Sequence, residues 1–359
     1  MVKMQLIYSL FSIQACVLIN LRLFASHGLT CKDDSGKPVD WHITYKLPKL
    51  DSTNPIVDDG TAYFYLGQNN ISWSLSKKSI TQNDTSFGFT LSPVYEKEKS
   101  KVEFYFLYND EDPNGPVSSY RGHTKGVVAF DNTSGFWLIH SIPKFPPHTT
   151  NQYKYPKNGE IYGQSGLCIT LNVSEIQKLS SLLYFNDPCV YDFYLPDAIA
   201  LKYPLLKAIS KQEHVSQSPW NQTLTLTTPN NISFQAFAKY KNFDKDLYSS
   251  WLAPYLGTNL LTETWQNEHG KLPSDCSKKW TVQNIKQISF ESTNISFKST
   301  RDHSKFAVAN GSLPWTCIGD INRVEPQKRR GGGTVCINSP VVWKNYHQLV
   351  TKVESCNEI

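Results

Sequence analysis

Two histidine–lysine pairs are the groups in this sequence whose types and spacing could carry out chemistry. His123 and Lys125 form one pair, and His303 and Lys305, 180 residues later, form the other. Each pair leads into an apolar, β-prone run, and side chains at positions i and i+2 of an extended strand point to the same face. An imidazole and an ammonium group can therefore reach one target in each copy.

Two such pairs suit cleavage of a phosphodiester without a metal ion. One neutral imidazole attacks phosphorus to form a phosphohistidine, and the other, as imidazolium, protonates the leaving oxygen and later activates water. The lysines bind the non-bridging oxygens and neutralise charge that develops in the transition state. Their charge also lowers the pKa of a nearby imidazole from about 6.5, and bound phosphate partly restores it. Since the general acid needs a proton, we expect activity to be favoured at acidic pH.

Polar residues recur at a fixed distance after both pairs. His140 lies seventeen residues after His123, and Asp320 lies seventeen residues after His303, each behind an aromatic-apolar run. A single His-x-Lys carries little weight in a chain with nine histidines, but two copies with matching offsets indicate two similar halves that share one site. We expect His140, Asp320 and the nearby Asn322 to support that site, the first two by orienting a catalytic imidazole. Ordinary polar residues at strand ends are the alternative.

A basic, glycine-rich loop follows the second copy. Its amide and guanidinium groups could approach a phosphate, and a solvated basic turn is the competing interpretation. The possible phosphate-binding residues are Arg329, Arg330, Gly331 and Gly332.

The elements that must position these groups belong to a folded α/β (α+β) chain. Of its 359 residues, 40% are hydrophobic and 13% aromatic, with frequent turn signals, so strands should be plentiful. The first pair leads through a turn into 136–142, which is hairpin spacing. We expect residues 1–28 to be a signal peptide, 29–205 and 206–359 to form the two halves, 187–209 to be the passage between them, and 341–353 to be a final helix.

The N-terminus and the cysteines indicate the secretory route. A basic start, a short apolar run and small residues near Gly28 are typical of a cleaved leader, and no other stretch approaches the apolar length of about 20 residues that a membrane helix needs. The seven cysteines after Cys16 favour disulfides, with one thiol left over, since no Cys-x-x-Cys or zinc-ligand spacing occurs. Eight sequons suggest a glycoprotein: Asn70, Asn83, Asn132, Asn172, Asn221, Asn231, Asn294 and Asn310.

Several motifs spread over the mature chain resemble the deoxyribonuclease II family. They include Gly122-His-Thr-Lys-Gly126, Gly135-Phe-Trp-Leu-Ile-His-Ser-Ile-Pro143, Asp302-His-Ser-Lys305, Pro314-Trp-Thr-Cys317 and Arg330-Gly-Gly-Gly-Thr334. The fold and paired motifs of that family are similar to the phospholipase D superfamily. The resemblance implies two pseudo-symmetric phospholipase D-like halves, each a mixed β-sheet flanked by helices, with the active site at their interface.

The same resemblance implies an activity and residue roles. The implied activity is that of a metal-independent endonuclease without a cofactor, which cuts DNA to 3′-phosphate ends in acidic lysosomes. The implied catalytic residues are His123, Lys125, His303 and Lys305, and His140 is a further functional position. The implied disulfides are Cys31–Cys168, Cys276–Cys356 and Cys317–Cys336, which leaves Cys189 unpaired. One departure concerns the superfamily pattern His-x-Lys-x4-Asp, because Asp131 falls one residue late and no Asp follows Lys305 at that offset.

Other functions stay open at this point. A phospholipase D-like lipid phosphodiesterase would use the same four residues, and a secreted glycoprotein that binds nucleic acid without cutting it is a third possibility. The net charge of +5 falls to about +3 without the leader, which is too mild to prove a polyanion ligand. We expect DNA as the partner, no metal and no membrane, a lysosomal or extracellular location, and either a monomer with an internal pseudo-dimer or a homodimer.

Overall fold

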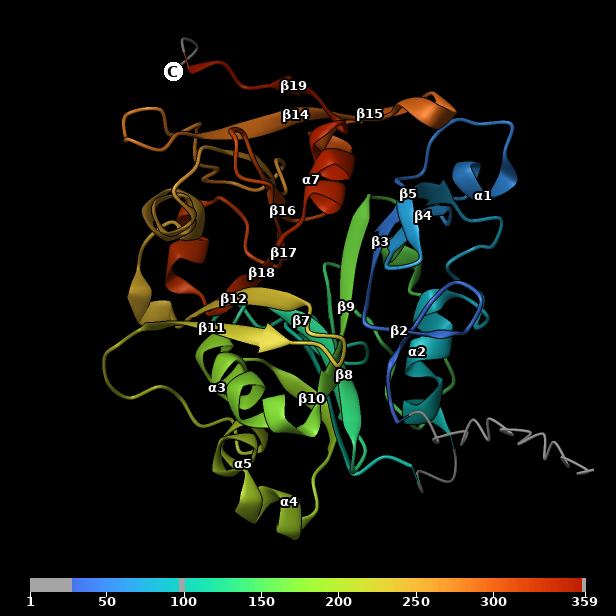
Figure 1. Ribbon diagram of the computed structural model, residues 1–359, viewed down its shortest axis with the longest axis vertical. Coiled ribbons are helices and arrows are strands. Elements are labelled where there is room, and N and C mark those ends of the chain that lie inside the picture. Colours follow the sequence, from blue (N-terminus) through green and yellow to red (C-terminus); the bar gives the residue numbers. More distant parts are fainter. Residues whose placement is uncertain (1–27, 97–100, 357–359) are drawn as a thin grey trace, which may run out of the picture.

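Two β-sheets face each other across a shared core in the computed structural model (Figure 1). It describes residues 28–96 and 101–356, so the expected leader lies outside the described residues except for Gly28. The first sheet has the order β10 (Val190–Tyr194), β6 (Phe104–Asn109), β7 (Lys125–Phe130), β8 (Ser134–His140), β9 (Gln164–Asn172), β3 (Trp41–Lys46), β4 (Tyr63–Gly67) and β5 (Asn70–Leu75). β1 (Cys31–Lys32) and β2 (Pro38–Val39) form a separate two-stranded ribbon that precedes β3 in the chain.

The second sheet is formed by the C-terminal part of the chain. Its order is β11 (Asn221–Thr227), β12 (Ser233–Lys239), β18 (Gly332–Asn338), β17 (Trp315–Gly319), β16 (Phe306–Ala309), β13 (Leu260–Glu263), β14 (Val282–Phe290) and β15 (Ile295–Lys298), with β19 (Val350–Val353) paired to β14. The pairing of β13 with β14 is parallel, and the pairings of the first sheet are antiparallel. The expected α/β fold class, two sheets flanked by helices, is confirmed. The expectation of a mixed sheet in each half holds for the second sheet and is wrong for the first, whose pairings are all antiparallel.

Period-two alternation explains the three layers of the core. Along β8, Trp137 and Ile139 face the core between the sheets, whereas Phe136 and Leu138 face the outer layer. Between the sheets, Phe64 of β4 stacks on Phe290 of β14 with ring centroids 4.0 Å apart. Burying such a ring stabilises the fold by about 2 kcal/mol, so this contact holds the halves together.

Helices cover the outer faces and link the two sheets. The seven α-helices of the described residues are α1 (Pro55–Asp58), α2 (Ser86–Tyr95), α3 (Ile176–Asn186), α4 (Asp197–Lys202), α5 (Pro204–Ser210), α6 (Ala253–Leu256) and α7 (Pro340–His347). α2 packs on the outer face of the first sheet, and α6, with the π-helical turn before it, packs on that of the second. α3 lies against β11 and β12 of the other half, and α7 contacts β5 as well as β16 and β17.

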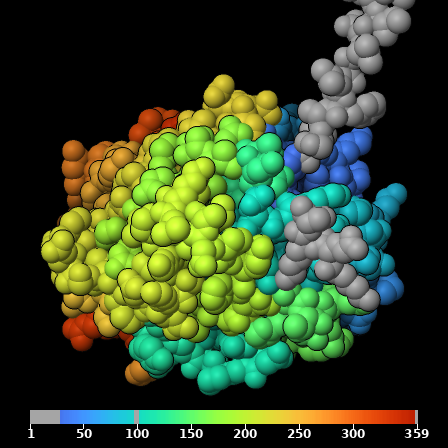
Figure 2. Space-filling view, turned by 90° about the horizontal axis from the view of Figure 1, so that it is seen from below, coloured from blue at the N-terminus to red at the C-terminus, as the bar shows by residue number. Residues whose placement is uncertain are grey.

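The passage between the halves has more regular structure than a linker. The expected segment 187–209 contains β10, α4 and most of α5, and it forms much of the surface seen in Figure 2 in yellow-green. The expected boundary between residues 205 and 206 falls inside α5, so the two halves stay a proposed division of one interlocked unit. The prediction of a helix over 341–353 was too long, because α7 ends at His347 and the chain then pairs with β14 as β19.

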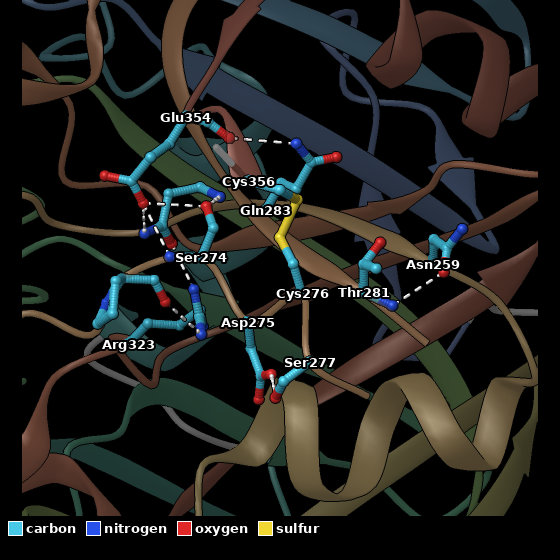
Figure 3. Close-up of a disulfide and its surroundings, with 12 residues drawn as sticks. Asn259, Ser274, Asp275, Cys276, Ser277, Thr281, Gln283, Arg323, Glu354 and Cys356 are labelled. Carbon is cyan, nitrogen blue, oxygen red and sulfur yellow. Dashed lines mark hydrogen bonds between the residues drawn. A yellow bond between two sulfur atoms is a disulfide. The ribbon is translucent and has the colours of Figure 1, made fainter. Parts of the chain in front are cut away.

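Three disulfides join the cysteines that the resemblance paired. Cys31–Cys168 ties β1 to β9, Cys317–Cys336 bridges the paired strands β17 and β18, and Cys276–Cys356 fastens the C-terminal segment; Cys189 is free. Figure 3 shows the Cys276–Cys356 disulfide with Glu354 nearby, whose carboxylate accepts hydrogen bonds from Ser274. Asn284 donates to the same carboxylate at 2.7 Å. Burial alone raises the pKa of Glu354. Hydrogen bonds to its carboxylate, of which the one from Lys286 contributes most, lower that pKa to about 2.

Most sequons lie on the surface. Six are exposed and two are half-buried, the latter being Asn70 and Asn221. The exposed ones are Asn83, Asn132, Asn172, Asn231, Asn294 and Asn310. No helix of the described residues has the length and apolar character needed to cross a bilayer.

Candidate active site

His123 is held by residues of the opposite half. It lies in the extended segment just before β7, and its backbone N–H donates to the Gly331 carbonyl at 2.9 Å. Its Nδ1 lies 2.5 Å from the carbonyl oxygen of Asp320. A carbonyl only accepts, so Nδ1 carries the proton and a neutral His123 presents Nε2 as its basic nitrogen.

His303 is held in the same way by the first half. Its backbone N–H donates to the Gly163 carbonyl at 2.8 Å, and its Nδ1 lies 3.0 Å from the Ser141 carbonyl. The amide oxygen of Gln164 is 3.2 Å from the same Nδ1. Each imidazole therefore belongs to one half and is oriented by the other, which brings the two predicted pairs to one site between the sheets.

Each pair leads into a strand, as predicted, but the histidine lies outside the extended strand that the i and i+2 spacing assumed. Both histidines precede their strands rather than lie within them, because β7 begins at Lys125 and β16 begins after Lys305. The lead-in segments bond to the other half at Gly331 and Gly163 instead of to neighbouring strands of their own sheets. In each copy, the histidine is therefore held by the other half, and the lysine lies at or directly before the start of the strand.

A buried carboxylate holds the first lysine. Lys125 Nζ forms an ion pair with Asp110 Oδ1, and Arg330 Nη2 donates to the other oxygen of Asp110 at 3.0 Å. Burial by itself raises the pKa of Asp110, but the Lys125 ammonium and the Arg330 guanidinium hold it below its usual range. Asp110 therefore stays ionised and fixes two cations beside the site.

The second lysine lacks such a carboxylate ion pair within the described residues. Lys305 Nζ donates to the His303 carbonyl at 2.6 Å. Burial, and next the positive charge of Lys125, lower the pKa of Lys305 to about 7. Lys305 is thus a group that carries most of its charge well below pH 7 and little of it well above pH 7.

Burial also favours the neutral form of both imidazoles in the free protein. The pKa of His123 is well below its usual value because of burial and then the Lys125 charge. The pKa of His303 is lowered in the same direction by burial, by Lys305 and by Lys125. Since Lys125 acts on His303 and Lys305 acts on His123, the two pairs share one electrostatic environment.

The supporting residues act partly through atoms that the sequence does not point to. Asp320 orients His123 with its backbone carbonyl, while its carboxylate accepts from Thr124 Oγ1 at 2.5 Å and from Gly333 N at 3.0 Å. Burial raises the pKa of Asp320 to about 6. Asn322 bonds the backbone N–H of Trp265 at 3.2 Å through its Oδ1.

His140 does not make the contact expected of it. Its buried ring accepts from the Ile142 N–H at 3.2 Å, and its Nε2 has no hydrogen-bond partner among the described residues. Burial and then the Lys125 charge lower the pKa of His140 to about 3. The orientation of His303 comes instead from the carbonyl of the next residue, Ser141, so His140 contributes by delivering that carbonyl from the end of β8.

The glycine-rich loop braces the first pair. Arg330 donates to the carbonyls of Arg121, Ser118 and Gly122 at 2.8, 2.9 and 3.3 Å, in addition to Asp110. Arg329 is exposed and pairs with Asp244, Gly331 supplies the carbonyl for His123, and Gly332 begins β18. Phosphate binding by these four residues stays a prediction, and the contacts present give the loop a structural role.

Asp110 and Trp265 are site residues that the sequence interpretation missed. Asp110 directly follows β6, so its only signal was a carboxylate at the end of an apolar strand. Asp131, the late residue of the superfamily pattern, instead accepts from the Leu29 N–H at 2.6 Å. Across the described ranges, no three His, Cys, Asp or Glu side chains form a group that could hold a metal ion.

Comparisons with known proteins agree on one family. The family model described as Deoxyribonuclease II matches residues 30–356. The chain is 42% identical over 335 residues to Deoxyribonuclease-2-alpha of Sus scrofa, covering 92% of this chain and 91% of that protein. It is 39% identical over 344 residues to Plancitoxin-1 of Acanthaster planci, with 95% and 96% covered. The solved yeast tyrosyl-DNA phosphodiesterase matches at 10% identity and a TM-score of 0.29 over 61% of this chain and 68% of that one, too low to bear on the fold.

Proposed function

This chain belongs to the deoxyribonuclease II family and is a nuclease of that type, and we propose on that premise that it hydrolyses DNA at acidic pH without a metal ion. The proposed products carry 3′-phosphate ends, and the reaction passes through a phosphohistidine. The crossed anchoring of His123 and His303 is the observation that supports this proposal.

The proposed reaction uses the Nε2 atoms of both imidazoles. Both Nδ1 atoms face backbone carbonyls, so Nε2 is the reactive nitrogen in each ring. One Nε2 attacks phosphorus as the P–O5′ bond breaks, and the other imidazole, as imidazolium, gives its proton to O5′. Water then attacks phosphorus and yields a proton to the second imidazole while the N–P bond breaks, which leaves the 3′-phosphate.

The lysines would carry the charge of the transition state. Lys125 is fixed by Asp110, and Lys305, with its pKa of about 7, is an ammonium at acidic pH. Buried cations at fixed positions stabilise developing negative charge without reorganisation. They also keep the imidazoles neutral, so the general acid gains its proton only at low pH or when a phosphodiester supplies negative charge.

We further propose a lysosomal or extracellular location and a monomer with an internal pseudo-dimer. Three disulfides and six exposed sequons support passage through an oxidising secretory compartment. Both histidines are anchored within a single chain, which supports a complete site in the monomer, with a homodimer as the alternative.

Plasmid cleavage at pH 5 with excess EDTA tests the proposal. Wild type should cut, and His123→Ala and His303→Ala should each lose about a thousandfold or more, as for residues that act as one unit. His347→Ala is the matched control, since that imidazole lies against Trp343 on α7, outside the site. A requirement for added metal, or undiminished cutting by either site variant, would refute the mechanism.

A further inference from the structure

Two partly exposed aromatic rings lie beside the catalytic His303. The ring centroid of Trp265 is 5.2 Å from that of His303, with the planes at 76°. The ring of Tyr162 lies 4.6 Å from Trp265 at 77°, again edge to face. Of the four proposed catalytic side chains, His303 is half-buried and the other three are buried, so these rings stand where the site approaches solvent.

The rings come from opposite halves and are tied to the backbone that positions His303. Tyr162 immediately precedes Gly163, whose carbonyl accepts from the His303 N–H and whose N–H donates to Arg301 O at 2.9 Å. Trp265 follows β13 by two residues, and its own N–H is fixed by Asn322. The two rings and the imidazole therefore keep a set arrangement before any ligand arrives.

Among the described residues, Trp265 shares an unpaired indole N–H with Trp220, Trp251, Trp280 and Trp315, and its place beside His303 sets it apart. Trp73 and Trp343 are also half-buried, and their indole N–H groups donate to Asn345 O at 3.0 Å and Ala309 O at 2.8 Å. The indole N–H of Trp265 has no partner within residues 28–96 and 101–356. A tryptophan left free in this way beside a catalytic group is available to a ligand.

We propose that Trp265 and Tyr162 form a rim that stacks on an unpaired nucleobase next to the scissile phosphate. This inference rests on the proposed function, because a phosphodiester at His303 Nε2 carries a nucleoside on each side. Aromatic rings bind bases through their faces and tolerate any sequence. The face of a base is covered in an intact duplex, so the rim engages single-stranded or locally opened DNA.

Cleavage of two single-stranded oligonucleotides tests the rim. One carries thymines throughout, and the other carries abasic tetrahydrofuran residues on both sides of a central phosphate. Trp265→Ala should lower kcat/KM on the thymine strand by about tenfold and change cutting at the abasic step by less than about twofold. Trp265→Phe should recover most of the loss, and Tyr162→Ala should act in the same direction with a smaller effect.

Tyr194→Ala is the matched control. Tyr194 is 46% exposed on the edge strand β10, opposite Tyr105, whereas Lys125 pairs with Asn109 at the other end of β6. Equal losses of Trp265→Ala on both strands would mean that the ring only positions His303, and no loss on either strand would mean that it has no role; both outcomes overturn the rim. Undiminished cutting by His303→Ala would instead overturn the proposed function, so the two failures are distinguishable.

Discussion

Replacing His42 by phenylalanine should remove part of the acid sensitivity of the fold. His42, the second residue of β3, lies fully buried, with its ring centroid 5.6 Å from that of Tyr65 and 6.2 Å from that of Phe87. Both ring nitrogens have no hydrogen-bond partner among the described residues. Burial lowers the pKa of His42 to about 3, whereas an imidazole in the unfolded chain titrates near 6.5.

The sign and size of the effect follow from these two pKa values. Stability from keeping His42 neutral is complete above pH 6.5 and is lost as the pH falls towards 3, because the unfolded chain takes up the proton first. At pH 5 the imidazole is protonated in the unfolded chain and neutral in the folded protein. That pH lies about 1.5 units below the pKa of the unfolded imidazole, and stability is lost over this interval. The free energy of unfolding should therefore fall by about 2 kcal/mol through His42 alone between pH 7.5 and pH 5.

Urea unfolding at these two pH values, with the disulfides intact, measures the effect. The loss between pH 7.5 and pH 5 should be about 2 kcal/mol smaller in His42→Phe than in wild type, whatever the absolute stability of the variant. His140→Phe should show a reduction of similar size, since the pKa of His140 is also about 3. Equal losses in wild type and His42→Phe would refute the reasoning, because they would mean that His42 takes up its proton in the folded state.

Three further predictions concern the site and its frame. Asp110→Asn should destabilise the fold by about 3 kcal/mol and lower DNA cutting at least tenfold, because Lys125 and Arg330 lose their buried carboxylate partner. Urea unfolding and plasmid assays measure the two effects, and an unchanged free energy of unfolding would contradict the prediction. Lys305→Met should weaken the binding of sulfate, used as a phosphate analogue in titration calorimetry, roughly tenfold at pH 5.5 and have little effect at pH 8.5, because Lys305 loses its charge around a pKa of about 7; a pH-independent difference would argue against this titration. Cys276→Ser with Cys356→Ser should cost about 4.5 kcal/mol by releasing a cross-link over a separation of 80 residues, and a melting temperature equal to that of wild type would disprove it.

The candidate catalytic residues were easier to predict than the atoms that hold them. Repetition of the His-x-Lys pair at matching offsets pointed to two halves around one site, and the two sheets and the crossed anchors agree with that arrangement. The offsets also led to Asp320 and to the end of β8. The contacts there are made by the carbonyls of Asp320 and Ser141, and side-chain identity does not reveal a backbone contact.

Other features depend on tertiary contacts that a single sequence does not display. Asp110 pairs with Lys125 across neighbouring strands, fifteen positions away, and nothing at Lys125 identifies that partner. Helical periodicity extended past His347, but pairing with the edge of β14 drew 350–353 into a strand. Trp265 stands beside His303 only because β13 and β16 are neighbours in the second sheet.

A double-mutant cycle on the two histidines tests the central claim that both halves form one site. The rates of wild type, His123→Ala, His303→Ala and the double variant would be measured on one plasmid at pH 5 in excess EDTA. The account predicts that each single change removes about a thousandfold or more and that the double change removes no more than either alone. Losses that multiply, or a single variant that retains most of its activity, would contradict a shared site.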